Sequence, residues 1–236
     1  MAFRPVFIPT PGAVTLVETK SIDFKWFPGM SVAQKQRSVD SLQQAALESM
    51  PSLSRILEVS SKSKDELGVA LSAFNLSFTT LKHNLTMSVE CAFQGSKVFE
   101  NGGPFKDLFR RTSREAKLDE RIKSSGRLTK FSFFNMDWEL EPRTAFYDWL
   151  YINALMKQPS SIIDEITSYS AFTDIEFNPE KSMNCQAYSI ALFVSLHEQG
   201  LLDKAIASKE SFLSTVKSSL ISNSSQNEAI QGDMLK

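Results

Sequence analysis

The chain has 236 residues, of which 42% are hydrophobic and 22% are charged, and its formal net charge is −1. This composition predicts a folded globular domain, excludes disorder as the main state, and provides no overall basic field that would attract nucleic acid. Because no run approaches the roughly eighteen apolar residues of a membrane span, and residues 1–10 lack a secretory signal, we expect a cytoplasmic protein with no membrane partner.

The first quarter of the chain predicts two strands with a helix between them. Residues 22–26 alternate apolar and polar side chains, which indicates a strand. Ser31, with Gln34 three residues later, is typical of a helix start, and the apolar spacing that follows predicts a helix that ends before Pro51. A second short strand is expected over residues 56–59.

The middle of the chain predicts two further strands and a buried helix. Apolar residues alternate with polar ones over residues 72–78 and again over residues 131–133, which indicates strands. Residues 88–99 have the apolar spacing of a buried helix, and the Asn-Gly-Gly-Pro cluster at residues 101–104 should end it.

The last third of the chain is expected to be helical. The predicted helices cover residues 145–156, with Pro142 at the start, and residues 162–169, 184–199 and 209–220. Short strands together with these helices predict an α+β, helix-rich single domain. We expect this domain to cover residues 1–220 and a polar tail to cover residues 221–236.

Three polar residues interrupt the apolar helix predicted over residues 88–99. Glu90, Gln94 and Lys97 have the spacing i, i+4, i+7, so on a helix they line one face. A polar group in an apolar segment is costly unless it is hydrogen-bonded or functional. The stripe therefore indicates either a site with a carboxylate, an amide and an ammonium, or a solvent-facing row with weak ion pairs.

Two further segments place polar or aromatic groups beside apolar elements. Asp174 lies just before the helix predicted over residues 184–199, whose positive end stabilises anions. Asn184 suits the cap of this helix as well as a ligand contact. Trp138 stands at a turn beside carboxylates, which fits either core packing or a stacking platform for a base or ribose.

The sequence contains no motif for a common cofactor and no clear metal site. It lacks the glycine-rich dinucleotide and phosphate-binding loops and the Gly-x-Ser-x-Gly turn of hydrolases. Zinc could be held only by the two cysteines and two histidines, which are His83, Cys91, Cys185 and His197. None of these pairs has the short spacing of a structural zinc site, so we expect neither metal nor cofactor.

The charged region before residue 128 carries two basic clusters. They are Arg110, Arg111 and Arg114, and then Lys117, Arg121, Lys123 and Arg127. Three interleaved acids, Glu115, Asp119 and Glu120, favour a solvated helix face with intrahelical ion pairs over contacts with phosphate. Any contact with nucleic acid must nevertheless come from a local surface, because the whole chain is not basic.

Four segments, in order, resemble the signature of the NADAR (YbiA-like) family. Residues 71–74 (Leu-Ser-Ala-Phe) resemble its Leu-Ser-Asn-Phe segment, and residues 88–99 resemble the segment that contains Glu-His-Tyr-Phe-Gln-Ala-x-Lys-Phe. Trp138 resembles a functional tryptophan of the family. Residues 172–174 (Phe-Thr-Asp) resemble its Trp-Gly-Asp, and residues 181–184 (Lys-Ser-Met-Asn) resemble its Lys-Gly-Lys-Asn.

The resemblance implies an enzyme that hydrolyses an N-glycosidic bond. The amino-terminal strand and helix within residues 1–55 resemble the NADAR subfamily encoded beside DarT-type toxins, which ADP-ribosylate DNA bases. This implies an antitoxin that removes ADP-ribose from guanine in nucleic acid, DNA rather than RNA, with ADP-ribose as product and a DarT-type toxin as functional partner. Cys91 and Ala92, which replace a His-Tyr pair of the signature, argue against the small-metabolite substrate of YbiA-like members.

The matched positions also imply roles for individual residues. We expect Glu90 to be the principal acid/base, Asp174 to stabilise the cationic sugar, and Trp138 to stack on the substrate. An alternative is a lysine nucleophile that captures the opened sugar as a Schiff base. The candidate lysines are Lys35, Lys62 and Lys97. The expected substrate-binding residues are Trp138, Gln94, Lys97, Lys62, Asn184, Lys181, Ser72 and Phe74.

Two other functions fit the same sequence. A non-catalytic antitoxin would bind its toxin or the modified DNA without turnover. Alternatively, the same fold would hydrolyse a free nucleotide or an aminosugar intermediate of the riboflavin pathway, because a fold by itself does not fix the substrate. Convergence of Glu90, Trp138 and Asp174 around one sugar-sized cavity would favour the nucleic-acid glycosidase.

Overall fold

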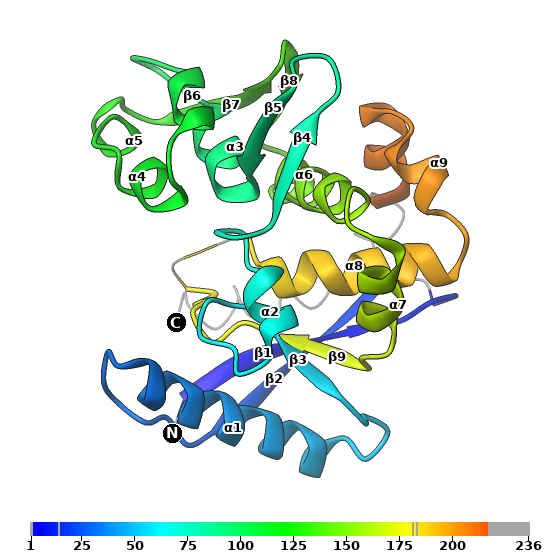
Figure 1. Cartoon of the computed structure of the whole chain (residues 1–236). Coiled ribbons are helices and arrows are strands. Elements are labelled where there is room, and N and C mark those ends of the chain that lie inside the picture. The colour runs from blue at the N-terminus through cyan, green and yellow to red at the C-terminus, as the bar shows by residue number, and fades with distance from the viewer. Residues whose placement is uncertain (1, 14, 181, 183, 217–236) are drawn as a thin grey trace, which may run out of the picture.

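The computed structural model describes residues 2–13, 15–180, 182 and 184–216, and Figure 1 shows how their helices and strands are arranged. The elements form an α+β fold that is rich in helices, as the sequence predicts. No helix within these described ranges is long and apolar enough to cross a membrane. The expected polar tail, residues 221–236, lies outside the described part of the chain.

A four-stranded sheet joins the first quarter of the chain to its last third (Figure 1). In the order β2-β1-β9-β3, its strands are β2 (Val17–Phe24), β1 (Ala2–Pro9), β9 (Ala171–Thr173) and β3 (Ile56–Glu58). β9 runs antiparallel to β1 and parallel to β3, so it is hydrogen-bonded on both sides. The strands predicted over residues 22–26 and 56–59 correspond to β2 and β3, whereas β1 and β9 are additions that sequence spacing did not indicate.

Helix α1 (Val32–Ser49) covers one face of this sheet and α8 (Gln186–Glu198) covers the other (Figure 1). α1 begins as predicted, because the backbone N–H of Gln34 donates to Oγ of Ser31 at 3.3 Å. Leu42 is completely buried in the small apolar core between α1 and the sheet. A polar outer face and an apolar inner face thus fix which side of α1 meets β2.

The two central helices, α8 and α6 (Ala145–Leu155), pack against each other and are almost wholly buried. Both are apolar on every side, which is typical of a helix enclosed by other elements. Pro142 precedes α6 instead of standing in its first turn. The N-cap position of α8 is Cys185, so the expectation that Asn184 caps this helix is wrong.

Two small sheets lie on the far side of α6 from the four-stranded sheet (Figure 1). The first pairs β4 (Ser77–Thr80) with β5 (Leu85–Ser88), and the second orders β6 (Lys97–Phe99), β7 (Leu128–Phe133) and β8 (Met136–Trp138) as β6-β7-β8. Helix α3 (Val89–Gly95) connects the two sheets and is buried throughout. The shorter helices are α2 (Glu66–Ala70), η1 (Lys106–Arg110), α4 (Ser113–Leu118), α5 (Arg121–Ser124), α7 (Ser160–Thr167) and α9 (Leu202–Ile206). Residues 209–216 are also helical, and residues 217–220 of the helix predicted over residues 209–220 lie outside the described part of the chain.

Two predicted elements differ from the observed ones. Residues 72–75 form a turn instead of a strand, because the N–H of Asn75 donates to the carbonyl of Ser72 at 2.8 Å. The helix predicted over residues 88–99 gives way to strand β6 at Lys97, because the chain pairs there with β7. Both differences bring polar side chains, including Ser72 and Lys97, to the lining of one cavity.

Candidate functional site

A cavity of about 1000 Å³ lies where α3, α6, β7 and the loops after β3 and β9 meet. This volume is at the upper end of small-molecule pockets. Most of the predicted site residues line it: Glu90, Asp174, Gln94, Lys97, Lys62, Asn184, Ser72 and Phe74. They come from distant parts of the sequence, so the fold assembles one site from residues within or near three of the segments that resemble the family signature, together with Lys62.

Helix α3 presents a buried carboxylate to the cavity and holds it with an amide. Ser88 caps the helix by accepting a hydrogen bond from the N–H of Cys91 at 3.1 Å. Glu90 is only 7% exposed, and Nε2 of Gln94 donates to its Oε1 at 2.9 Å, as the i, i+4 spacing predicts. Oε1 of Gln94 is buried with no hydrogen-bond partner among the described residues, so a ligand hydroxyl or N–H can be accepted there.

A second carboxylate enters the cavity from the end of β9. Asp174 is 7% exposed, and its Oδ1 accepts a hydrogen bond from the N–H of Glu176 at 3.0 Å. Burial, together with repulsion from the neighbouring Glu58, raises the pKa of Asp174 to about 8. This side chain therefore keeps its proton at neutral pH, unlike an exposed aspartate.

Glu58, on β3, holds the segment that carries Asp174 from behind. Its Oε2 accepts a hydrogen bond from Oγ1 of Thr173 at 2.7 Å, and its Oε1 accepts one from the N–H of Ile175 at 2.8 Å. Burial raises the pKa of Glu58 as well. The parallel pairing of β3 and β9 is what sets the two acids side by side.

Lys97 reaches the same cavity from strand β6, although the sequence predicted it on a helix. Its Nζ lies 4.8 Å from the ring centre of Phe93. Burial lowers the pKa of Lys97 to about 8, while the Glu90 carboxylate acts in the opposite direction. An amine with this pKa is mostly a cation at pH 7, and half of it is a neutral nucleophile at a pH of about 8.

An aromatic wall, formed by Phe93, Phe131 and Tyr147, closes one side of the cavity. The rings of Phe93 and Phe131 are 5.3 Å apart, and Tyr147 meets Phe93 edge-on at 5.2 Å. Burial raises the pKa of Tyr147 well above its ordinary value, so its hydroxyl stays protonated. This wall, which the sequence patterns did not identify, provides an apolar surface for a flat ring.

Trp138 does not reach this wall, so the expectation that it stacks on the substrate needs correction. It is 1% exposed and absent from the cavity lining. Its ring packs in the core, 5.2 Å from the ring of Trp149 and 5.7 Å from that of Phe146. The pairing of β8 with β7 turns the indole toward α6, which explains its position.

This placement predicts separate effects on stability and on substrate binding. Trp138→Ala should lower the free energy of unfolding by about 3–5 kcal/mol, because it leaves a large hole in the core. Trp138→Phe should cost less and leave KM unchanged, since the buried indole N–H has no partner among the described residues. Denaturant unfolding and steady-state kinetics measure the two effects. A raised KM in a stable Trp138→Phe variant would contradict a purely structural role.

Basic side chains other than Lys97 also form part of the cavity lining. The lining includes Lys62, Lys117, Arg127 and Arg143. Nζ of Lys117 lies 4.9 Å from the ring centre of Phe74, and Nε of Arg127 pairs with Glu100 at 3.3 Å while its side chain remains 82% exposed. Cations in this arrangement suit a ligand that carries a diphosphate.

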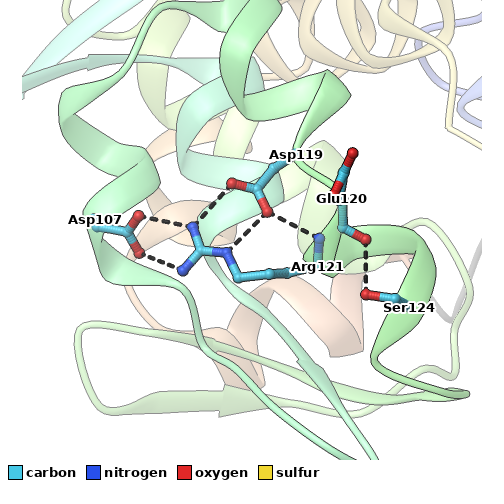
Figure 2. Close-up of polar contacts among 5 residues, drawn as sticks. All are labelled: Asp107, Asp119, Glu120, Arg121 and Ser124. Atoms are coloured by element: carbon cyan, nitrogen blue, oxygen red, sulfur yellow. Dashed lines mark hydrogen bonds and ion pairs between the residues drawn. The ribbon is translucent and has the colours of Figure 1, made fainter.

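Another arginine of the charged region, Arg121, is held by two ion pairs. Figure 2 shows Arg121 between two carboxylates, with its guanidinium 2.7 Å from Oδ2 of Asp107 and 2.8 Å from Oδ1 of Asp119. Asp119 lies at the end of α4, Arg121 in α5 and Asp107 on η1, so these ion pairs join neighbouring elements and are not the intrahelical pairs that the sequence predicted. The second basic cluster thus divides, because Lys117 and Arg127 line the cavity whereas Arg121 is neutralised locally.

Of the predicted lysines that the structure describes, Lys35 does not line the cavity. Lys35 lies on α1, where its Nζ pairs at 3.0 Å with Glu176, a residue of the cavity rim. The carboxylate holds this ammonium outside the cavity, which corrects its expected catalytic position. Lys181 lies outside the described residues.

Sequence reasoning also missed Gln186, in the first turn of α8. Its Oε1 accepts a hydrogen bond from the N–H of Ala73 at 2.6 Å, and its Nε2 donates to the carbonyl of Val59 at 2.5 Å. Gln186 also lines the cavity and hydrogen-bonds to the carboxyl of Asp174. A polar amide at the start of an otherwise apolar helix was the signal that could have identified it.

Comparison with known proteins adds one match. The family model described as "DarT1-associated NADAR antitoxin" matches residues 2–226. The matched range contains the four-stranded sheet, both central helices and all the cavity-lining residues described above. A search of curated proteins finds no match.

Proposed function

The chain belongs to the family of DarT1-associated NADAR antitoxins, and from this membership we propose that it is an ADP-ribosyl N-glycosidase that removes ADP-ribose from guanine bases in nucleic acid. Such an activity would reverse the modification made by a DarT-type toxin. One observation carries the proposal: Glu90 and Asp174, both 7% exposed, line a single cavity together with the basic residues Lys62, Lys117 and Arg127. Most glycosidases pair two carboxyl groups, one acting as the acid and the other as the base or nucleophile.

The proposed reaction adds one water across the bond between the anomeric carbon and the guanine nitrogen. Glu90 accepts a proton from the water as its oxygen bonds to the anomeric carbon. The carbon–nitrogen bond breaks, its electron pair goes to guanine, and Asp174 donates a proton to the departing base. The products are free ADP-ribose and unmodified guanine.

The raised pKa changes the role that we assign to Asp174. The sequence suggested an anion that stabilises the cationic sugar, but a carboxyl group with a pKa of about 8 starts the reaction protonated. We assign it as the general acid. After Asp174 has donated its proton, the resulting carboxylate can stabilise the sugar cation. The stabilising role that the sequence suggested therefore follows the proton transfer.

The cavity offers complementary contacts for the rest of the substrate. We assign the diphosphate to the cationic rim formed by Lys62, Lys117 and Arg127. The free Oε1 of Gln94 suits a ribose hydroxyl beside Glu90. The aromatic wall suits an adenine or guanine ring. These contacts would orient the anomeric carbon between the two carboxyl groups.

The alternative route through a lysine now rests on Lys97 and Lys62, which line the cavity. Lys97 is the stronger candidate, because its lowered pKa makes the neutral amine available at moderately alkaline pH. In that route the sugar ring opens to an iminium between C1 and the guanine nitrogen, and the neutral amine adds to C1. The bond from C1 to guanine then breaks, guanine leaves with the electron pair and a proton from the amine, and the lysine Schiff base that remains is hydrolysed by water to ADP-ribose and the free amine. Borohydride would reduce that Schiff base to a stable adduct.

The test of the proposed function uses oligonucleotides that carry ADP-ribose on guanine or on thymine. We expect release of free ADP-ribose, measured by liquid chromatography, from the guanine-linked substrate and not from the thymine-linked one. No release from either substrate, by a folded protein that still protects against the toxin, would instead indicate a binding antitoxin. Preferential turnover of a free nucleotide or aminosugar would indicate a metabolic N-glycosidase.

A further inference from the structure

A group of cations and aromatic rings lies outside the cavity, on elements from the first forty residues. We define the amino-terminal platform by its members, Arg4, Lys25, Trp26, Phe27, Lys35 and Arg37. It occupies the start of β1, the segment after β2 and the first turns of α1. None of these residues lines the cavity, and the catalytic proposal makes no use of them.

The platform is built from two adjacent rings, each approached by two cations. Nζ of Lys35 lies 4.8 Å from the ring centre of Trp26, and the guanidinium carbon of Arg4 lies 5.4 Å from it. The guanidinium carbon of Arg37 lies 4.1 Å from the ring centre of Phe27, and Nζ of Lys25 lies 5.2 Å from it. Cations interleaved with aromatic rings are the pattern of surfaces that bind single-stranded nucleic acid.

A chain of contacts connects the platform with the cavity mouth. Lys35 touches the Trp26 ring on one side and pairs with the Glu176 carboxylate at 3.0 Å on the other. Glu176 lines the cavity and follows Asp174 by two residues. A single strand of nucleic acid that leaves the cavity beside Glu176 would therefore meet the amino-terminal platform first.

The charge of the platform is mostly uncompensated. In the part of the chain that the structure describes, Lys25 and Arg37 form no ion pair with a carboxylate, and both are exposed. Arg121, by contrast, is neutralised by two acids. Because the whole protein has a net charge of −1, an unpaired local cluster of this kind stands out as an anion-binding surface.

We propose that the amino-terminal platform binds the single strand of nucleic acid that flanks the modified base. The proposal rests on the proposed function, and it adds the path that the nucleic-acid strand takes across the protein surface. A single strand is required, because a base must leave its duplex to reach acids that are buried, and because stacking on Trp26 and Phe27 needs exposed base faces. The cations would hold the backbone phosphates.

The test measures binding of an unmodified, fluorescently labelled single-stranded DNA by anisotropy. The variant Lys25→Ala with Arg37→Ala should bind about tenfold or more weakly, and its salt dependence should fall by about 1.4 in log–log slope, which is about 0.7 per lost phosphate contact. The matched control is Arg110→Ala with Lys123→Ala, which removes the same charge from exposed residues outside the cavity lining. The control should bind like the wild type.

Kinetics with two substrates separates this proposal from the proposed function. For an ADP-ribosylated oligonucleotide, the platform variant should have a raised KM and an unchanged kcat. For ADP-ribosylated guanosine, which has no flanking strand, both KM and kcat of the platform variant should equal those of the wild type. Wild-type affinity in the platform variant, an equal loss in the control, or equally tight binding of duplex DNA would overturn the proposal. Platform-dependent binding without release of ADP-ribose would leave the platform standing and refute the glycosidase.

Discussion

Replacing Glu90 by glutamine is expected to lower kcat for release of ADP-ribose by about 10²–10⁴-fold, the usual contribution of a positioned acid/base. Glutamine has nearly the same shape, and its amide oxygen can still accept the hydrogen bond that Nε2 of Gln94 donates at 2.9 Å. The variant should therefore fold, bind substrate with a similar KM, and lack the group that takes the proton from water. Single-turnover assays with a guanine-linked ADP-ribosyl oligonucleotide measure the effect.

The control for this experiment is Glu48→Gln, which removes a carboxylate from the exposed end of α1, away from the cavity lining. Its turnover should equal that of the wild type. Full turnover in a folded Glu90→Gln variant would remove Glu90 from the acid/base role. Protection of cells against the toxin by an inactive Glu90→Gln variant would show that binding alone suffices.

The second large effect is a loss of activity at alkaline pH. Asp174 must be protonated to act as the acid, and its pKa is about 8. Lys97, whose pKa is also about 8, must be charged to act as a cation beside Glu90. We therefore expect kcat/KM, which reports the free enzyme, to fall above about pH 8. The fall should be about tenfold per pH unit if one of these two groups must be protonated, and up to about a hundredfold per pH unit if both must be.

Two variants assign this alkaline limb. Asp174→Asn should lower the rate by about 10²-fold or more and leave only the part of the limb that belongs to Lys97. Glu58→Gln keeps an acceptor for the N–H of Ile175 and removes a repelling carboxylate, so the pKa of Asp174 should fall and the limb should move to lower pH. A rate that rises through pH 8, with a borohydride-trapped adduct on Lys97, would support the lysine route instead.

The sequence predicted the parts of the site that depend on local spacing. Glu90 and Gln94 are four residues apart on α3, and helical geometry alone brings their side chains together. Asp174 was indicated by its place before a predicted helix and by the family resemblance, and no periodicity could have placed it beside them. The predictions that the structure supports least are those that depend on how distant segments pack.

Three residues show why the remainder could not be predicted. Glu58 meets Asp174 because β3 and β9 pair across more than a hundred residues, and a short apolar strand does not specify its partner. Trp138 was interpreted as a stacking platform because an indole beside a turn looks the same in sequence whether it faces a cavity or the core. The spacing of Lys97 from Glu90 and Gln94 fits a helix, but the pairing of β6 with β7 places Lys97 in an extended conformation.

The position of β9 between two partners has a mechanical consequence. Backbone hydrogen bonds to β1 and β3 anchor it on both edges, so the side of the cavity that carries Asp174 is stiff. Another part of the cavity lining contains Arg127, Glu141 and Arg143, whose side chains are 82%, 74% and 64% exposed. Adjustments that admit a bulky polymer-linked nucleotide, and later release its products, should therefore occur at these exposed side chains while the acid stays fixed.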